Sequence, residues 1–251
     1  MIGSTIVRLD SVDSTNNYAA KELLTKSLKE GTVFIASCQE SGRGTGQASW
    51  ESTAGLNLTL SIVLHPRQIA ISRQFYISKA ISLGVADFLV KYVEGVSIKW
   101  PNDIYINDKK IAGILIETAI SGGKFSRAIV GIGLNINQEK FISDAPNPVS
   151  LKNLTGETYE LSLMLIDLCA CLDNRYRILL SGDFAILDHD YDALLYLKGV
   201  WTNFRELNSV LREENSVFEG KILGVEEDGR LKIETRQGEV RGFYFKEVTF
   251  L

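Results

Sequence analysis

Side chains suited to phosphate chemistry crowd into one short segment, KWPNDIYINDKKIAGILIE, at residues 99–117. Lys99 and Lys110 carry ammonium groups that can stabilise negative charge as it develops on a reacting phosphate. Asn102 offers an amide, and Asp103 offers a carboxylate that can hold Mg²⁺ or accept a proton. Each residue taken alone also fits a surface hairpin with incidental charges. The segment as a whole predicts an anion-binding site at one end of a sheet.

A polar, glycine-rich loop at residues 39–55 supplies a second candidate anion site. Its GRGTG run, residues 42–46, places three glycines around Arg43, so backbone amides can approach an anion that the guanidinium neutralises. The loop lacks the lysine and the Ser or Thr of a nucleotide P-loop, which disfavours a kinase-like NTPase. In isolation the run also fits a flexible surface loop.

The run GIGLN, residues 131–135, matches a dinucleotide-binding fingerprint only in part. Ile136 stands where the third glycine is required, and strand-like sequence rather than a helix surrounds the run, which disfavours a Rossmann site. Glycines inside a strand mark a bulge or the close approach of a ligand, and Gly113 fits the same interpretation. Asn135 would then present its amide to a polar ligand group.

Hydrophobic periodicity predicts the elements that hold these residues. Strands are expected at 5–9, 32–38, 56–64, 96–100, 103–107, 111–120 and 125–137. Helices are expected at 13–28, 71–93 and 161–179, followed by a second helical stretch that ends near Leu197. This order predicts an α+β fold in which a mixed or antiparallel sheet has helices on one face. The short turns bring Lys99, Asn102, Asp103 and Lys110 to one end of that sheet.

The last part of the chain changes character. Residues 216–251 alternate strictly between apolar and polar side chains, with turn signals at Asp228-Gly229 and Gln237-Gly238. Four short strands joined by tight turns predict a small β-barrel. We therefore expect a catalytic domain at residues 1–197 and a barrel domain at residues 198–251.

Composition restricts the class of protein. The chain has 251 residues with a formal net charge of −4, which argues against a surface built mainly to hold nucleic acid. Its three cysteines have no disulfide-framework spacing, and neither a signal peptide nor an apolar run long enough to span a membrane is visible. We expect a cytoplasmic protein without membrane contacts.

Five motifs occur in a fixed order, and together they resemble one family. These are DSTN (13–16), Q-x-x-GRG (39–44) followed by Trp50, KWPND (99–103), K-x-x-GIL-x-E (110–117) and G-x-G-x-N (131–135). The set resembles the biotin protein ligases, also called biotin–acetyl-CoA-carboxylase ligases. The resemblance implies a catalytic domain similar to class II synthetases and an SH3-like barrel for the tail.

The resemblance also implies roles for single residues. A biotin pocket would be lined by Ser14, Thr15, Asn16, Gln39, Arg43, Gly44, Thr45, Lys110 and Gly113. ATP would be contacted by Trp50, Lys99, Asn102 and Asn135, with the Trp50 ring stacked on adenine. Lys110, Arg43 and Asp103 would be the catalytic residues, and Asp103 would also be the candidate Mg²⁺ ligand.

The reaction that the resemblance implies has two steps. The biotin carboxylate attacks the α-phosphorus of MgATP, which gives biotinyl-5′-adenylate and pyrophosphate. A lysine of a biotin carboxyl carrier protein domain then attacks the mixed anhydride, which gives an amide and AMP. Two anions must meet in the first step, and this need accounts for the cations Arg43 and Lys110.

The chain departs from the family pattern in the glycine-rich loop. The usual sequence resembles GRGRRGR, whereas this chain has GRGTGQA, so Thr45 replaces the second arginine and Gln47 and Ala48 follow. Fewer charges would then cover the adenylate. We hypothesise that this protein releases biotinyl-adenylate more readily than its arginine-rich relatives do.

Partners and alternatives follow from the same pattern. The first predicted strand begins by Thr5, so we expect the short form that has no N-terminal DNA-binding domain, as a monomer or weak homodimer. One alternative is a lipoate or octanoate ligase or transferase of the same fold. Another is a non-catalytic protein that binds biotin or nucleotide, although such a protein would not need both Arg43 and Lys110 at a phosphoryl centre.

Overall fold

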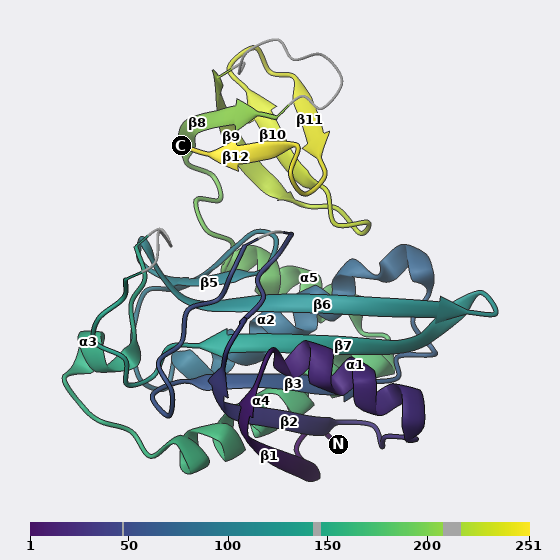
Figure 1. Ribbon diagram of the computed structural model, residues 1–251. Helices are drawn as coiled ribbons and strands as arrows, with labels where there is room; N and C mark the ends of the chain where they lie inside the picture. Colours follow the sequence, from purple (N-terminus) through teal and green to yellow (C-terminus); the bar gives the residue numbers. More distant parts are fainter. Residues whose placement is uncertain (47, 143–146, 208–216) are drawn as a thin grey trace.

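The computed structural model describes residues 1–46, 48–142, 147–207 and 217–251. It has a large seven-stranded sheet with helices packed on it and a separate five-stranded antiparallel sheet near the C-terminus (Figure 1). This architecture confirms the predicted α+β class and the change in character of the tail. None of the described helices is both long and apolar enough to cross a membrane.

The large sheet is mixed, with the strand order β1-β2-β3-β7-β6-β5-β4. β1 runs parallel to β2, and the remaining neighbours are antiparallel. Every residue of β3 is buried because both faces of the sheet are covered there, which explains why apolar residues predominate in it. The strands are β1 (Thr5–Val12), β2 (Thr32–Gln39), β3 (Leu58–Leu64), β4 (Val96–Lys99), β5 (Asp103–Ile106), β6 (Lys109–Ser121) and β7 (Lys124–Leu134).

Helices cover both faces of this sheet, which corrects the expectation that they lie on one face. Ile62 and Val130 belong to the main core, which includes residues of α2 and α4. The adjacent strand residues Val63 and Ile129 point the other way and pack with Ala19 of α1. The helices are α1 (Thr15–Thr25), α2 (Phe75–Leu89), α3 (Leu151–Thr155), α4 (Leu161–Ser181) and α5 (Phe184–Ala193), with a 3₁₀ turn at Ile71–Arg73.

The second sheet contains one strand more than the four predicted. Its order is β11-β10-β9-β8-β12, and the additional strand is β8 (Trp201–Glu206). Only Phe204 of β8 is fully buried, so its apolar alternation is too weak to predict a strand. The other strands are β9 (Val217–Val225), β10 (Leu231–Thr235), β11 (Val240–Phe243) and β12 (Val248–Phe250).

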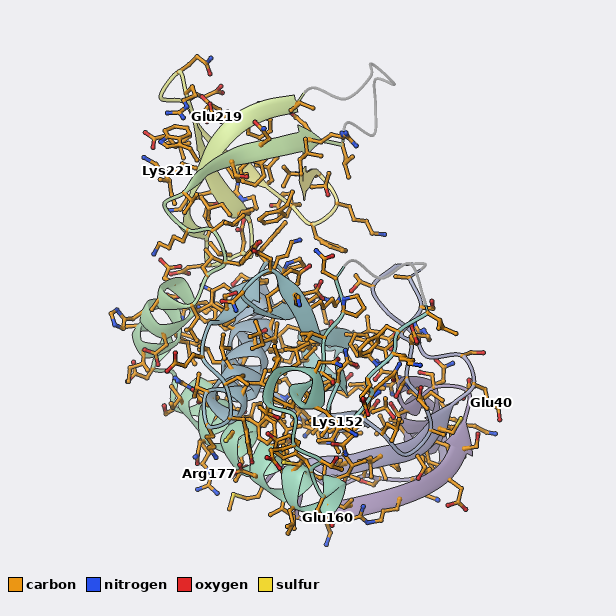
Figure 2. All side chains as sticks on the ribbon, turned by 90° about the vertical axis from the view of Figure 1, so that its left-hand side faces the viewer. Glu40, Lys152, Glu160, Arg177, Glu219 and Lys221 are labelled. Atoms are coloured by element: carbon orange, nitrogen blue, oxygen red, sulfur yellow. The ribbon has the colours of Figure 1, made fainter. Side chains whose placement is uncertain are left out.

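The second sheet, which we call the barrel, packs against the end of the large sheet that carries the KWPND turn. Trp100 Nε1 donates a hydrogen bond to the carbonyl of Gly229 at 2.9 Å, and its ring lies edge-on to Phe245 with centroids 6.4 Å apart. Trp100 is only 5% exposed as a result. Figure 2 shows Glu219 and Lys221 on the upper part of the barrel, away from this contact.

Candidate active site

A cavity of about 320 Å³ opens where the glycine-rich loop, the KWPND turn and the barrel meet. Its walls include the start of α1, the end of β2, and parts of β6 and β7. The sequence-predicted site residues that line it are Ser14, Thr15, Asn16, Gln39, Arg43, Gly44, Thr45, Trp50, Lys99, Asn102, Asp103, Lys110 and Gly113. Residues from well-separated parts of the chain therefore face one cavity.

The start of α1 forms a buried polar wall. The backbone amide of Thr15 donates to Gln39 Oε1 at 2.8 Å, and Thr15 Oγ1 donates to the same oxygen at 3.1 Å. Ser61 Oγ donates to Asn16 Oδ1 at 2.6 Å and lies 2.7 Å from Thr15 Oγ1. Thr15 and Asn16 are each 3% exposed, and such buried groups keep a fixed direction when their hydrogen bonds are satisfied.

The strand glycines make room for the protein's own side chains. A Cβ on Gly131 would lie 2.5 Å from Asn16 Oδ1, and a Cβ on Gly133 would lie 2.2 Å from Trp50 Cε2. A Cβ on Gly113 would lie 3.0 Å from Trp50 Cζ3, so the space expected for a ligand beside this residue holds the indole instead. Direct contact between Gly113 and biotin stays a prediction.

Backbone hydrogen bonds join the two arms of the glycine-rich loop. Trp50 N donates to the carbonyl of Gly42 at 2.8 Å, and Gly44 N donates to the carbonyl of Ala48 at 2.7 Å. Trp50 lies flat against the sheet, and its buried Nε1 has no hydrogen-bond partner among the described residues. Gln47 lies outside the described residues. Stacking of Trp50 on adenine stays a prediction.

Two lysines enter the cavity from the KWPND hairpin. Lys110 Nζ forms an ion pair with Asp103 Oδ1 at 2.7 Å and lies 5.8 Å from the Trp50 ring centre. Lys99 Nζ lies 4.8 Å from the ring centre of Tyr105 and 5.0 Å from that of Phe250. Burial among these rings lowers the pKa of Lys99, and the charge of Lys110 acts in the same direction while Asp103 opposes it.

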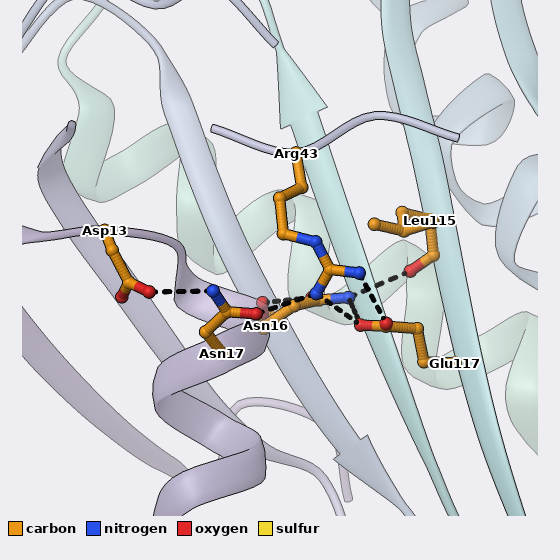
Figure 3. Close-up of polar contacts among 7 residues, drawn as sticks. Asp13, Asn16, Asn17, Arg43, Leu115 and Glu117 are labelled. Atoms are coloured by element: carbon orange, nitrogen blue, oxygen red, sulfur yellow. Dashed lines mark hydrogen bonds and ion pairs between the residues drawn. The ribbon is translucent and has the colours of Figure 1, made fainter. Parts of the chain in front are cut away.

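Arg43 reaches the opposite side of the cavity, toward α1 and β6. Its guanidinium forms an ion pair with Glu117 of β6 at 2.8 Å and donates to Oδ1 of Asn17 at 2.7 Å (Figure 3). The two predicted catalytic cations therefore each have a carboxylate partner. A contact of Arg43 with a phosphoryl group stays a prediction.

The two asparagines predicted to contact ATP lie in different surroundings. Asn102 Nδ2 donates to Thr45 Oγ1 at 2.8 Å, so the KWPND turn is bonded directly to the glycine-rich loop. Asn135 is 2% exposed, its amide donates to the carbonyl of Val149 at 3.0 Å, and it is not among the residues that line the cavity. Its contact with nucleotide stays a prediction.

Several cavity residues were not predicted from sequence. Ser61, which lies behind the cavity and holds Thr15 and Asn16, is with Thr59 one of two polar residues in the fully buried strand β3, and this exception was a usable signal for a polar site. Phe245, Val248, Thr249 and Phe250 line the cavity from the barrel, and nothing in their local sequence marks them. Such contacts depend on how the barrel packs against the large sheet.

The cavity has few groups that could hold a metal. Asp103 is the only carboxylate among the residues that line it, and the described part of the chain contains no cluster of three or more His, Cys, Asp or Glu side chains that could hold a metal ion. One carboxylate fits Mg²⁺ that arrives with the phosphates of a nucleotide, because Mg²⁺ keeps much of its water and is commonly held by one or two carboxylates. The site can therefore bind a nucleotide, orient a second anion and stabilise charge between them.

Comparison with known proteins decides the family. Residues 9–135, half of the chain, match the model of the biotin/lipoate A/B protein ligase family. The chain belongs to this family. The bifunctional ligase/repressor BirA of Bacillus spizizenii is 31% identical over 248 residues, which cover 95% of this chain and 72% of that protein. The biotin–[acetyl-CoA-carboxylase] ligase of Paracoccus denitrificans is 33% identical over 159 residues, 61% of this chain and 65% of that protein.

Solved structures of biotin protein ligases share the fold as well. The enzyme of Aquifex aeolicus, in complex with biotin and ATP, superposes with a TM-score of 0.79 at 24% identity, covering 98% of both chains. The match covers nearly the whole chain, so it confirms the predicted mixed α+β architecture with a separate antiparallel sheet in the C-terminal region. The family assignment confirms the resemblance read from the five motifs.

Proposed function

We propose that this member of the biotin/lipoate A/B protein ligase family is an ATP-dependent biotin protein ligase. It joins biotin to the AMP moiety of ATP as biotinyl-5′-adenylate, with release of pyrophosphate, and then transfers biotin to a lysine of a carrier protein, with release of AMP. One observation carries the proposal: Arg43 of the glycine-rich loop and two lysines of the KWPND hairpin, Lys99 and Lys110, reach a single cavity next to a buried polar wall. That arrangement suits a reaction in which two anions must be brought together.

The buried polar wall suits the head of biotin. Thr15, Asn16 and Gln39 present fixed donors and acceptors, while Leu60, Leu115 and Ile132 add apolar surface to the same cavity. A ring system with a polar ureido group and an apolar body needs both kinds of contact. The carboxylate at the end of the biotin chain would then approach Lys110.

The opposite side of the cavity suits MgATP. Lys99 and Lys110 would neutralise phosphate oxygens, Asp103 would hold the magnesium of the substrate, and Trp50 would face the adenine ring. Positive charge placed in advance lowers the cost of bringing the carboxylate to the α-phosphorus. The adenylate forms beneath the glycine-rich loop, which limits its contact with water.

In the second step a lysine of the acceptor attacks the adenylate. The names of the relatives imply a biotin-dependent carboxylase as the owner of that lysine, and we propose its biotin carboxyl carrier domain as the partner. We also propose residues 1–197 as the catalytic domain and 198–251 as the barrel domain. The monomeric or weakly dimeric state, and the lack of contact with DNA or membranes, stay predictions.

The decisive experiment mixes the purified protein, MgATP, biotin and a biotin carrier domain, and then detects transferred biotin with streptavidin. Label on the wild-type carrier, and none on a carrier whose target lysine is replaced by arginine, is the expected result. Parallel reactions with lipoate test the related activity of the same fold. Failure to form biotinyl-adenylate in the absence of carrier would refute the ligase function.

A further inference from the structure

The glycine-rich loop has a single cation to offer the substrates. Arg43 is the only basic residue within 39–50, because Thr45 stands where an arginine is usual. A lone guanidinium on a glycine-rich stretch has many accessible orientations, and most of them must be given up before it can bind an anion. The groups that orient Arg43 therefore determine how well the loop works.

Glu117 orients Arg43 from the neighbouring sheet. Arg43 Nη2 donates to Glu117 Oε1 at 2.8 Å, and Nη1 lies 3.3 Å from Oε2, a two-point pairing that fixes the direction of the guanidinium (Figure 3). Nη1 also donates to Asn17 Oδ1 at 2.7 Å. Asn17 is held in turn because its amide donates to Asp13 Oδ2 at 2.7 Å. Arg43 is thus fixed by β6 and α1 together.

The same carboxylate holds a residue of the buried polar wall. Asn16 Nδ2 donates to Glu117 Oε2 at 2.8 Å, while Asn16 Oδ1 accepts from Ser61 at 2.6 Å. Asn16 fits there only because Gly131 has no side chain. Glu117 therefore connects the buried polar wall to the glycine-rich loop, because it bonds to Asn16 of the wall and to Arg43 of the loop.

We propose that Glu117 is a positioning residue for the glycine-rich loop, which sets Arg43 over the biotin-binding end of the cavity through a carboxylate shared with Asn16. The inference rests on the proposed ligase function for the identity of the ligand. Loss of the carboxylate weakens binding of biotin and of its adenylate. It leaves ATP affinity nearly unchanged, because Lys99, Lys110 and Asp103 have contacts of their own.

The protein contains a matched ion pair without these connections. Arg236 and Glu219 on the barrel form two hydrogen bonds of 2.6 and 2.7 Å, with side chains 50% and 42% exposed. The corresponding exposures of Arg43 and Glu117 are 42% and 38%. Neither barrel residue lines the cavity. Exposed pairs of this kind contribute little by themselves, so Glu219 provides the control.

The test compares Glu117→Gln, Glu117→Asp and Glu219→Gln in the full chain. The measurements are calorimetric biotin affinity, the KM values for biotin and ATP in pyrophosphate release, and the rate at which preformed adenylate escapes into excess unlabelled biotin. We expect Glu117→Gln to weaken biotin binding about five- to tenfold and to speed the escape of biotinyl-adenylate by a similar factor. The KM for ATP should change less than about twofold. Glu117→Asp keeps both acceptor oxygens and restores part of the loss, and Glu219→Gln behaves as wild type.

Two results would overturn the proposal. One is biotin affinity and adenylate escape within twofold of wild type in Glu117→Gln. The other is an equal rise in both KM values with a lowered melting temperature and no restoration by Glu117→Asp, which would indicate a purely structural role. A wild-type protein that binds biotin yet forms no adenylate would refute the ligase function alone. The positioning role of Glu117 could still be tested in that case, by comparing the biotin affinities of the Glu117 variants.

Discussion

At the scale of single residues, two of the three cations that line the cavity form ion pairs with carboxylates. Lys110 is paired with Asp103 and Arg43 with Glu117. An unpaired cation in a half-buried site would carry a desolvation cost and would have no preferred direction. Each carboxylate therefore holds a cation in a fixed direction, and under the proposed function a substrate anion would take over part of that contact.

Replacement of Lys110 tests the charge at the reacting centre. We expect Lys110→Ala to slow adenylate formation about 10²–10³-fold, because one preorganised group that stabilises the transition state is removed. Pyrophosphate release with saturating biotin and MgATP measures the effect. The adjacent exposed residue Lys109 supplies the control Lys109→Ala, which should retain the wild-type rate. A rate for Lys110→Ala within a few-fold of wild type would remove this residue from its role.

Thr45 tests how firmly the loop retains the intermediate. Its hydroxyl accepts a hydrogen bond from Asn102 at 2.8 Å but carries no charge toward the adenylate. We expect Thr45→Arg to slow escape of biotinyl-adenylate about tenfold by adding a charge-assisted contact. Thr45→Val removes only the hydrogen bond and separates the two effects. Escape from wild type that is equal to or slower than from Thr45→Arg would contradict the hypothesis.

At the scale of elements, the strand glycines show where sequence reasoning succeeds and where it stops. The hairpin turns predicted between residues 96 and 137 brought Lys99, Asp103 and Lys110 together as expected. Glycines 131 and 133 were interpreted as marks of a bulge or of the close approach of a ligand, whereas the protein's own side chains approach them. The approaching groups are Asn16 and Trp50, and no local pattern relates those distant residues to β7.

Gly133 tests this packing directly. A Cβ there would lie 2.2 Å from the Trp50 ring, so Gly133→Ala must displace the indole or the strand. We expect a loss of about 1–3 kcal/mol in the free energy of unfolding, or a displaced Trp50 with weakened ATP binding. Gly242→Ala is the matched control, because the nearest atom to its Cβ is 3.5 Å away. Unchanged stability and unchanged ATP binding in Gly133→Ala would contradict the packing.

At the scale of the whole molecule, the barrel contributes to the environment of the active site. Phe250 of β12 lies against Lys99, and Trp100 in the same KWPND motif bonds to Gly229 of the barrel. The sequence predicted a barrel but could not predict this contact, because packing between distant parts of a chain has no local signature. The barrel thereby helps to exclude water from a lysine that we propose to contact phosphate.

Lys99 should therefore reduce stability in favour of function. Burial lowers the pKa of Lys99, so between that lowered value and its ordinary value of about 10.4 the unfolded chain binds more protons here and stability rises with pH. We expect Lys99→Met to raise the melting temperature by about 2–4 °C at pH 7 while adenylate formation falls. Thermal melts should show this gain shrinking as the pH approaches about 10.4. A gain independent of pH, or a less stable variant, would contradict the burial cost.

The three tryptophans also make the protein well suited to optical study. Trp50 lies against the sheet inside the cavity, Trp100 is buried where the barrel meets the large sheet, and the Trp201 ring lies under Arg236 on the barrel at 3.9 Å. Because indole emission responds to its surroundings, variants that keep one tryptophan and replace two by phenylalanine would each report on a separate region. Fluorescence could then follow substrate entry, movement of the barrel relative to the large sheet, and barrel unfolding as separate signals, without an attached dye.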